Sequence, residues 1–324
     1  MKIGFIGLGN VGGKLAGNLL KNGYDLTVRD LDRQLAQVFL DQGANWADSP
    51  KQLVAQVDLV ITCLPSPAAC AKVLESDDGI IAAMQPGKIW METSTTDASE
   101  VQRLAGLVLA KGGMALEAPV SGGCHRAATG NIAILVGGDR QAFETALPVL
   151  TTLGRRVLHT GAIGSASALK VMTNYLATVN LVALCEALTV AKKAGLDLNT
   201  TYEAIRISSG NSFVHETESQ VILNGSRDIS FTMDLVIKDV GLFDSLARDV
   251  GVPLELSPMV LNIFKDGQKR YGPREWSPNI IRRLEEAAGV DVIAPGFPAE
   301  MVDNEPTMEG AEVIPRGRKP TVSG

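Results

Sequence analysis

The chain has 324 residues, of which 45% are hydrophobic and 20% are charged, and its formal net charge is −6. This length is enough for two domains with substantial cores. Nucleic-acid binding draws on counterion release by a basic surface, and no basic stripe is visible, so we expect a small-molecule partner and no nucleic acid. The four cysteines form no CxxC pair, which predicts neither a zinc site nor a disulfide framework and fits a cytoplasmic protein.

The N-terminal segment has the pattern of a dinucleotide-binding loop. A short apolar strand from residue 2 leads into a glycine loop, a helical pattern that ends at Gly23, and a second strand that ends at Asp30. A lone GxGxxG is a weak signal, but its place between a strand and a helix, followed by an acidic residue, is the full fingerprint. Gly7 allows the tight turn, Gly12 lets helix and strand pack closely, and the amides of residues 9–11 are expected to hold the cofactor phosphates. The cofactor-binding residues of the loop are thus Gly7, Leu8, Gly9, Asn10, Val11 and Gly12.

Asp30 indicates which cofactor binds. A carboxylate there accepts hydrogen bonds from the adenosine ribose hydroxyls and repels a 2′-phosphate, so the sequence predicts NAD rather than NADP. Arg29 and Arg33 weaken this preference, because either guanidinium could turn toward a phosphate.

The alternation of strands and helices continues through the next segment. Apolar runs at 58–64 and 88–93 predict buried strands, with helical patterns at 66–75 and 98–111. Ligands of open parallel sheets bind at the carboxyl ends of the strands. The residues expected to line the adenine and nicotinamide sides are therefore Leu64, Pro65 and Thr95.

A further strand is predicted at 114–120, directly before Ser121, Gly122 and Gly123. Glycines after a strand expose backbone N–H groups that can hold a small anion, such as a substrate carboxylate. Strands at 131–136 and 156–160, with a helix at 140–152 between them, are expected to complete an N-terminal Rossmann-type doubly wound α/β domain spanning residues 1–162.

A long helix is expected next, because about thirty residues run without Pro or Gly up to Gly195. Its centre is apolar nearly all round, but polar residues interrupt the run, so we expect a buried inter-domain helix and no membrane span. Lys170 and Asn174 stand four apart and share one face. Taken alone, Lys170 is better explained by snorkelling at a domain rim than by function.

The rest of the chain divides into a helical domain and a tail. Five further helical patterns follow, which predicts an all-α domain at 163–289 built on the long helix. From residue 290 to 324 the sequence is proline-rich and acidic without an amphipathic period. We expect this tail to be disordered or laid across a neighbouring surface, as an arm between subunits.

Four separated stretches together resemble the β-hydroxyacid dehydrogenase family, which includes 3-hydroxyisobutyrate dehydrogenase and tartronate semialdehyde reductase. They are GFIGLGNVG at 4–12, EAPVSGG at 117–123, GAIGSASALKVMTN at 161–174 and FTMDLVIKD at 231–239. The resemblance covers about residues 1–288. It implies a helical domain like that of 6-phosphogluconate dehydrogenase and a homodimer or homotetramer, and it makes snorkelling a poor explanation of Lys170.

The resemblance also implies a set of roles. Lys170 takes the place of the catalytic lysine, a general acid/base that exchanges a proton with the C3 hydroxyl during hydride transfer, and Asn174 that of the asparagine beside it. Lys238 lies near the nicotinamide end, and Thr95 contacts the cofactor. The residues implied to bind the substrate are Ser121, Gly122 and Gly123, with Ser209, Gly210 and Asn211 in a second loop.

The sequence departs from the family pattern after the first substrate loop. Small residues are commoner where this chain has Cys124, His125 and Arg126. Arg126 could bind a second acidic group on the substrate, or it could be an ordinary surface arginine. The three dispersed histidines predict no metal site.

The leading hypothesis is therefore an NAD-dependent oxidoreductase that interconverts a 3-hydroxy acid, similar to 3-hydroxyisobutyrate, and its semialdehyde. Two alternatives stay open at this point. One is an NADPH-dependent reductase of glyoxylate, succinic semialdehyde or an imine, and the other is a catalytically silent nucleotide-binding scaffold. Retention of Lys170, Asn174, Ser121 and Lys238 argues against the scaffold.

Overall fold

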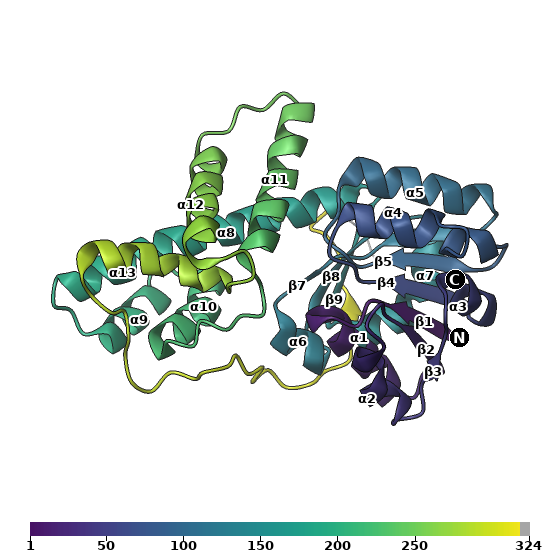
Figure 1. The fold of residues 1–324 in the computed structure, drawn as a ribbon, viewed down its shortest axis with the longest axis horizontal. Helices are drawn as coiled ribbons and strands as arrows, with labels where there is room; N and C mark the ends of the chain where they lie inside the picture. The colour runs from purple at the N-terminus through teal and green to yellow at the C-terminus, as the bar shows by residue number, and fades with distance from the viewer. Residues whose placement is uncertain (318–324) are drawn as a thin grey trace. The chain divides into compact units, whose positions relative to one another are not determined.

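The structure is a computed structural model, and it describes residues 1–317. The chain forms two compact units (Figure 1). The first contains residues 1–170 and takes in the C-terminal segment from Asp303, and the second contains residues 171–302. The division falls after Lys170, inside a long helix, and not at the predicted position between residues 162 and 163. The chain therefore passes from one unit to the other twice.

The first unit is built on a mixed sheet that is mostly parallel. Among the described residues its strands are β1 (Ile3–Ile6), β2 (Leu26–Arg29), β3 (Asn45–Trp46), β4 (Leu59–Thr62), β5 (Ile89–Glu92), β6 (Met114–Glu117), β7 (Val120–Ser121), β8 (Ala133–Gly138), β9 (Arg156–Gly161) and β10 (Ala311–Glu312). Their order is β10-β9-β8-β6-β5-β4-β1-β2-β3, and β7 pairs with β8 off this path. Strands β3, β2, β1, β4, β5 and β6, neighbours in this order, run parallel, whereas β8 is antiparallel to β6.

Helices cover both faces of this sheet (Figure 1). They are α1 (Asn10–Lys21), η1 (Arg33–Ala36), α2 (Gln37–Leu40), α3 (Pro50–Gln56), α4 (Pro67–Glu75), η2 (Ile80–Ala83), α5 (Ala98–Ala110), α6 (Cys124–Thr129) and α7 (Arg140–Leu153).

The strands show why two layers of helices are needed. In β5, Ile89 and Met91 belong to the core under α1 and α7, whereas Trp90 belongs to the core under α3, α4 and α5. Successive side chains of a strand point to opposite faces, so a strand that is apolar at every position must be covered on both sides. The predicted Rossmann-type domain is confirmed. Its strand order reverses at β1, between β2 and β4, where such sheets bind their ligand.

The second unit is helical and forms around α8 (Ser165–Lys193), most of which belongs to it. Its other helices are α9 (Leu198–Arg206), α10 (Phe213–Asn224), α11 (Met233–Asp249), α12 (Leu256–Tyr271), η3 (Ser277–Ile281) and α13 (Arg282–Ala288).

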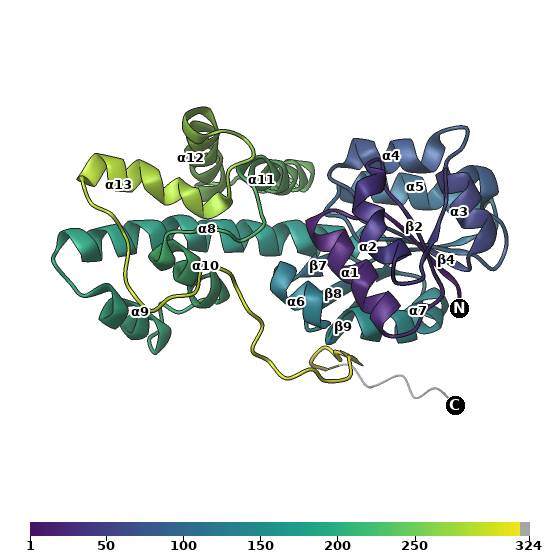
Figure 2. The same ribbon diagram turned by 60° about the horizontal axis from the view of Figure 1, so that its bottom comes forward.

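Helix α8 is long and apolar enough to cross a membrane, but it supplies the core of this unit. Leu181, Leu184 and Leu188 are buried at helical spacing and pack with side chains from α9 to α12. Helix α8 runs between α9 and α10 on one side and α11, α12 and α13 on the other (Figure 2). The helix ends before Gly195, whose φ of +79° provides the predicted glycine stop.

The C-terminal segment was expected to be disordered or to reach a neighbouring surface, and the structure places it on its own chain. Val292 and Ala294 are buried in the core of the second unit. From Asp303 the segment belongs to the first unit, where Ala311 and Glu312 form β10 and pair in parallel with β9. Residues 318–324 lie outside the described part of the chain.

Candidate active site

The glycine loop between β1 and α1 has the shape that a dinucleotide requires. Gly7 has a φ of +98°, and a Cβ there would lie 2.2 Å from the carbonyl oxygen of Cys63. A Cβ at Gly12 would lie 2.0 Å from the Gly7 oxygen, so the close packing of helix on loop requires both glycines. At Gly9, by contrast, a Cβ would meet nothing within 4 Å. The backbone is thus open to a ligand at the middle glycine.

The first turn of α1 is also prepared for an anion. Serine or aspartate side chains cap the first turns of α3, α4, α5 and α7. The first turn of α1 begins at Gly9 and contains no acidic residue, and no side chain among residues 1–317 caps it. Helix N-termini bind phosphate through free N–H groups and the helix dipole. The residues present therefore fit the pyrophosphate of a dinucleotide.

Asp30 follows β2 and is tied to the glycine loop. Its Oδ2 accepts a hydrogen bond from the backbone N–H of Leu8 at 2.6 Å, and its Oδ1 accepts one from Asp32 at 2.9 Å. The carboxylate is thus held beside the loop before any ribose hydroxyl donates to it. Arg33, which the sequence left free to turn toward a 2′-phosphate, has its guanidinium 5.2 Å from the centre of the Trp46 ring.

A buried network shapes the backbone at the carboxyl ends of β4 and β5, where Leu64, Pro65 and Thr95 were predicted to line the cofactor. The backbone N–H of Leu64 donates to Ser94 Oγ at 2.6 Å, and this hydroxyl bonds in turn to Glu92. Glu92 also accepts from Thr62 Oγ1 at 2.8 Å. Burial raises the pKa of Glu92, against the hydrogen bonds from Ser94 and Thr62 that lower it. Sequence reasoning did not single out Glu92 or Ser94, although a polar pair at the end of a buried strand was the signal.

The predicted substrate loop is a turn that only glycine adopts readily. Ser121 ends β7, and Gly122 and Gly123 follow with φ of +132° and +88°. Two side chains of α6 pack over these glycines: a Cβ at Gly122 would lie 3.2 Å from Arg126 Cδ, and one at Gly123 would lie 2.8 Å from His125 Cε1. Burial, followed by the neighbouring Arg126 guanidinium, lowers the pKa of His125. An uncharged imidazole therefore faces the loop at neutral pH.

Arg126 is engaged by the C-terminal segment. Its Nη2 lies 2.6 Å from Glu305 Oε1, while Nη1 of Arg155 lies 2.7 Å from the other oxygen of the same carboxylate. The sequence left open whether Arg126 is an ordinary surface residue or binds an acidic group. In the structure it binds an acidic group of its own chain, the Glu305 carboxylate.

Glu117 links the sheet to the start of α8. It is fully buried at the end of β6, and its carboxylate accepts hydrogen bonds from the backbone N–H groups of Gly164, Ala166 and Ser167 at 2.6, 2.8 and 3.1 Å. The Ser167 hydroxyl donates to it as well, at 2.5 Å. A carboxylate that caps a helix in this way satisfies the N–H groups of the first turn and is favoured by the helix dipole.

Lys170 lies one turn after this cap. It is only 6% exposed, so it is not a lysine that extends into solvent. The rigid cap fixes the direction of the turn that carries it. In the sequence Glu117 is only the first residue of the stretch EAPVSGG, and its partners around residue 165 lie about fifty positions away along the chain.

Within the second unit, Asn174 is held by α11. Its Nδ2 donates to Asp239 Oδ2 at 2.5 Å, and Lys238 Nζ lies 2.7 Å from Asp239 Oδ1. Asp239 is 2% exposed. The buried carboxylate thus joins the two predicted site residues Asn174 and Lys238, and it fixes the orientation of the Asn174 amide.

The second predicted substrate loop connects α9 and α10. Ser209 and Gly210 are exposed, while the Asn211 side chain donates to Glu216 at 2.6 Å and accepts from the backbone N–H of Ser212 at 2.8 Å. The Asn211 amide is thereby oriented by the first turn of α10.

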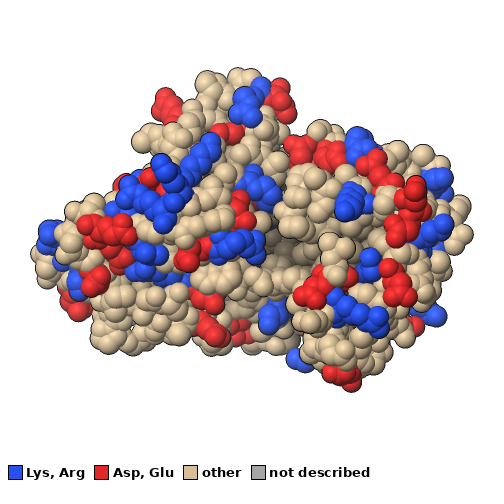
Figure 3. Space-filling model, viewed as in Figure 1, with Lys and Arg blue, Asp and Glu red and all other residues tan. Residues whose placement is uncertain are grey.

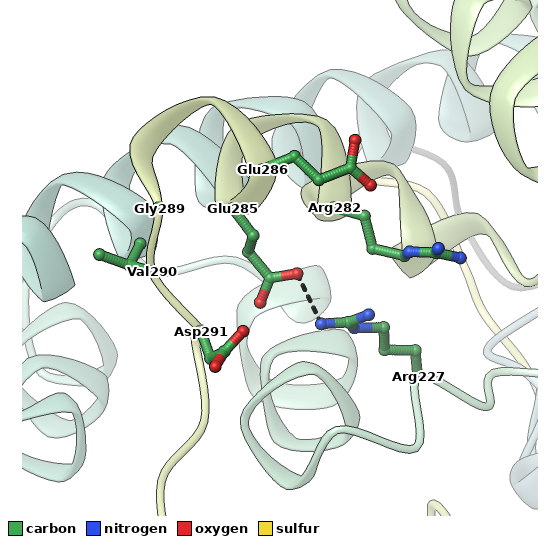
Figure 4. Close-up of a pocket in the computed structure, with 7 residues that line it drawn as sticks. All are labelled: Arg227, Arg282, Glu285, Glu286, Gly289, Val290 and Asp291. Carbon is green, nitrogen blue, oxygen red and sulfur yellow. Dashed lines mark hydrogen bonds and ion pairs between the residues drawn. The ribbon is translucent and has the colours of Figure 1, made fainter.

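A charged cavity of about 330 Å³ lies elsewhere on the second unit (Figure 4). In it Arg227 Nη2 lies 2.6 Å from Glu285 Oε2, and the other oxygen of Glu285 accepts from the backbone N–H of Val292 at 2.8 Å. These contacts tie the start of the C-terminal segment to α13, so the charges of the cavity have a structural role. Lysine, arginine and acidic side chains are interspersed over the face of the molecule in Figure 3.

Comparison with known proteins gives consistent matches for both units. Residues 2–161 match the family model described as the NAD binding domain of 6-phosphogluconate dehydrogenase. Residues 164–284 match the one described as NAD-binding of NADP-dependent 3-hydroxyisobutyrate dehydrogenase.

Individual proteins match along nearly their whole length. The chain is 33% identical to 2-(hydroxymethyl)glutarate dehydrogenase of Eubacterium barkeri, over 90% of this chain and 97% of that protein. It is also 33% identical to the NAD-dependent L-serine dehydrogenase of Pseudomonas aeruginosa, over 87% and 97%. A crystal structure of 3-hydroxyisobutyrate dehydrogenase from Salmonella typhimurium superimposes with a TM-score of 0.79 at 29% identity, over 87% of this chain and 99% of that one.

Proposed function

Because the chain belongs to the family of NAD-binding 3-hydroxyisobutyrate dehydrogenases and related hydroxyacid dehydrogenases, we propose that it oxidises a 3-hydroxy acid to the corresponding semialdehyde with NAD. The substrates named by the three relatives share one fragment, HOCH2–CH(R)–COO⁻. The substituent R is methyl in 3-hydroxyisobutyrate, ammonium in serine and carboxyethyl in 2-(hydroxymethyl)glutarate. We assign this fragment as the substrate class.

We assign the cofactor to the crevice at the carboxyl ends of β1 and β4. NAD, when bound, accepts the hydride that leaves C3 of the substrate. Its pyrophosphate fits the open backbone at Gly9 and the uncapped first turn of α1. Asp30 would accept from the ribose hydroxyls, Leu64, Pro65 and Thr95 would line the rings, and Lys238 is assigned to the nicotinamide end.

In the reaction itself, the first substrate loop would hold the carboxylate with the backbone N–H groups of Ser121, Gly122 and Gly123. Lys170 would take the proton of the C3 hydroxyl as the hydride leaves, and would return it in the reverse direction. Asn174, one turn along α8, would orient the reacting hydroxyl. The residues of the second loop, Ser209, Gly210 and Asn211, are assigned to the substrate on the family resemblance alone.

The observation that carries this proposal is the buried lysine on a capped helix. Lys170 is 6% exposed, and the preceding turn is fixed by four hydrogen bonds to Glu117. The cap fixes the backbone that carries Lys170, and burial restricts the rotamers of its side chain, which reduces the ordering that proton transfer in a defined geometry requires.

We test the role with Lys170→Ala. Removal of a general base should lower kcat for 3-hydroxyisobutyrate by at least about a hundredfold, while NADH, titrated by its fluorescence, binds as in the wild type. The matched control is Lys192→Ala, in the last turn of the same helix, which should keep full activity. Substantial turnover by Lys170→Ala would remove this lysine from the mechanism.

The same assay, run with both cofactors, addresses NAD preference. We expect the higher kcat/KM with NAD, because the Asp30 carboxylate would lie against a 2′-phosphate. A preference for NADP would contradict this role of Asp30 and would favour the reductase alternative.

We also propose that the protein is a cytoplasmic homodimer or homotetramer. Helix α8 leaves large apolar side chains exposed, with Leu176 at 58% and Val190 at 66%. Apolar surface of this kind on a helix that already fills a core is typical of subunit interfaces. Size-exclusion chromatography with light scattering gives the mass directly, and a monomer at micromolar concentration would exclude the proposal.

A further inference from the structure

The C-terminal segment lies beyond the part of the chain that matches the family. The family models end at residue 284, and the three relatives cover 87 to 90% of this chain although they are matched over 97 to 99% of their own length. We call residues Asp303–Glu312, which lie on the first unit, the C-terminal strap. Because the family match ends before the strap, the role of the strap follows from its own contacts in this chain.

One end of the strap is bound to α6 and the residues just after it. Asp303 accepts hydrogen bonds from Thr129 Oγ1 and, at 2.6 Å, from Asn131 Nδ2. Glu305 accepts from Arg126 and Arg155, with one oxygen for each guanidinium. Partial burial alone would raise the pKa of Asp303, but its hydrogen bonds and the nearby Arg126 hold it below the ordinary value. The strap thus brings two negative charges to a surface with two positive ones.

The ion pairs of Glu305 with Arg126 and Arg155 lie beside the predicted substrate loop. The stem of Arg126 crosses Gly122, since a Cβ on that glycine would lie 3.2 Å from Arg126 Cδ. The side chains of Arg126 and Arg155 are each 20% exposed. An arginine in this position offers a planar fork that binds carboxylates strongly, and one of its nitrogens, Nη2, already bonds to Oε1 of Glu305.

The strap does not depend on Glu305 to stay in place. At its other end Glu312 binds Arg140 with both oxygens, at 2.6 and 2.9 Å, and β10 extends the sheet at β9. Gly310 lies so close to the backbone that a Cβ there would come within 2.3 Å of the Gly154 oxygen. Loss of the Glu305 charge should therefore leave the strap in position.

We propose that Glu305 is a specificity-determining residue, which occupies Arg126 and thereby prevents the site from accepting a second carboxylate in the substituent R of the substrate. The inference rests on the proposed function, because it concerns the same substrate loop. Substrates with a small or uncharged R, such as 3-hydroxyisobutyrate, are accepted. A dicarboxylate such as 2-(hydroxymethyl)glutarate must displace Glu305 from Arg126 or bind next to its negative charge, and both are unfavourable.

The test compares kcat/KM for 2-(hydroxymethyl)glutarate and for 3-hydroxyisobutyrate in the full chain. Wild type should prefer the monocarboxylate. In Glu305→Gln the ratio should shift toward the dicarboxylate by about tenfold, the effect of one hydrogen-bonded charge pair. The shift should disappear in the double variant Arg126→Gln/Glu305→Gln, because it requires the released guanidinium.

The matched control is Glu312→Gln, which removes a strap carboxylate of the same kind far from the loop along the strap and should leave the ratio unchanged. A dicarboxylate preference in wild type, or an unchanged ratio in Glu305→Gln, would overturn the inference.

A binding experiment separates this outcome from failure of the proposed function. The affinities of glutarate and butyrate for the NADH-saturated protein are measured by calorimetry in wild type and in Glu305→Gln. If neither hydroxy acid is turned over, the proposed function fails, yet selective tightening of glutarate in Glu305→Gln still supports the role of Glu305. If glutarate binds equally to both proteins, the inference fails whatever the activity.

Discussion

At the scale of single residues, the site depends on buried carboxylates that hold other groups in place. Glu117 is the clearest case, because its carboxylate accepts from donors at the start of α8: the N–H groups of Gly164, Ala166 and Ser167 and the Ser167 hydroxyl. Gly137 makes room for it, since a Cβ there would lie 2.3 Å from Glu117 Oε1. The carboxylate therefore determines where the helix that carries Lys170 begins.

We predict that Glu117→Gln lowers kcat for 3-hydroxyisobutyrate by about tenfold, with the KM for NAD little changed, because an amide places a donor against the helix N–H groups and displaces Lys170. Steady-state kinetics with both substrates varied gives these constants. Glu117→Asp keeps an acceptor of the same charge and should recover most of the kcat.

The control for Glu117 is Asp97→Asn, which alters the cap of α5 in the same unit. Asp97 Oδ1 accepts from the N–H groups of Ser99 and Glu100, so this variant should lose a comparable part of its thermal stability. It should keep its kcat. Equal losses of kcat in the two variants would show that Glu117 acts only through stability.

Residues of this kind mark the limit of what the sequence can predict. Gly7, Gly9, Gly12 and Asp30 were predicted because their spacing within one strand–loop–helix unit determines their geometry. The cap formed by Glu117 and the link from Glu92 to Leu64 join positions that only the folded sheet brings together. The sequence marks such residues as polar positions at the ends of buried strands, but it carries no local signal for the partners that they bind.

At the scale of elements, the predictions were good where a pattern was long and regular. The buried strands β1, β4 and β5 and the long helix α8 were all predicted, because continuous apolar runs and the absence of Pro and Gly define them locally. The strand expected at 114–120 is instead two short strands, β6 and β7, interrupted at Pro119. Proline removes a backbone donor from the ladder. Before this point β6 pairs with both β5 and β8, and after it β7 pairs with β8.

Helix α10 contains a group that makes the stability of the second unit depend on pH. Part of the Glu218 side chain is accessible, but its Oε2 is buried, and no donor among residues 1–317 is in hydrogen-bond range. Burial raises the pKa of Glu218 to about 8 from 4.5. The folded state therefore holds this proton at a pH where the unfolded chain has lost it.

The sign follows from linkage. The folded protein binds more protons than the unfolded chain between the two pKa values of Glu218, so the free energy of unfolding falls as pH rises from about 4.5 to about 8 and is level above that.

We predict that Glu218→Gln removes this decline in the free energy of unfolding. The gain over wild type, measured by urea unfolding, should be small at pH 5 and grow by up to about 1.4 kcal/mol per pH unit. Glu186→Gln, an exposed position on α8, should show no such trend. A gain that does not vary with pH would contradict the assignment.

At the scale of the whole molecule, the chain closes its sheet with its own C-terminus. Composition identified residues 290–324 as a proline-rich acidic tail, and the absence of an amphipathic period gave no reason to expect a strand. The two residues of β10 are held by pairing with the edge of β9 and by the ion pair between Glu312 and Arg140. Such short pairing is determined by the surface that receives it, which lies about 150 positions earlier in the chain.

Removal of residues 303–324 should therefore destabilise the first unit and expose its edge. The truncated chain loses the two-residue ladder with β9, the bidentate pair of Glu312 with Arg140, and the shared carboxylate of Glu305. Partly buried ion pairs and hydrogen bonds of this kind contribute about 1 kcal/mol each, so we expect the free energy of unfolding to fall by about 2–4 kcal/mol.

The truncated protein should also form larger assemblies, because a bare strand edge offers unpaired N–H and C=O groups to other chains. Urea unfolding measures the free energy of unfolding, and light scattering measures the size of the assemblies. The control removes only residues 317–324, which keeps the strap and should resemble the wild type in both measurements. If the two truncations behave alike, β10 contributes nothing to stability, and the sheet would be closed at β9 without it.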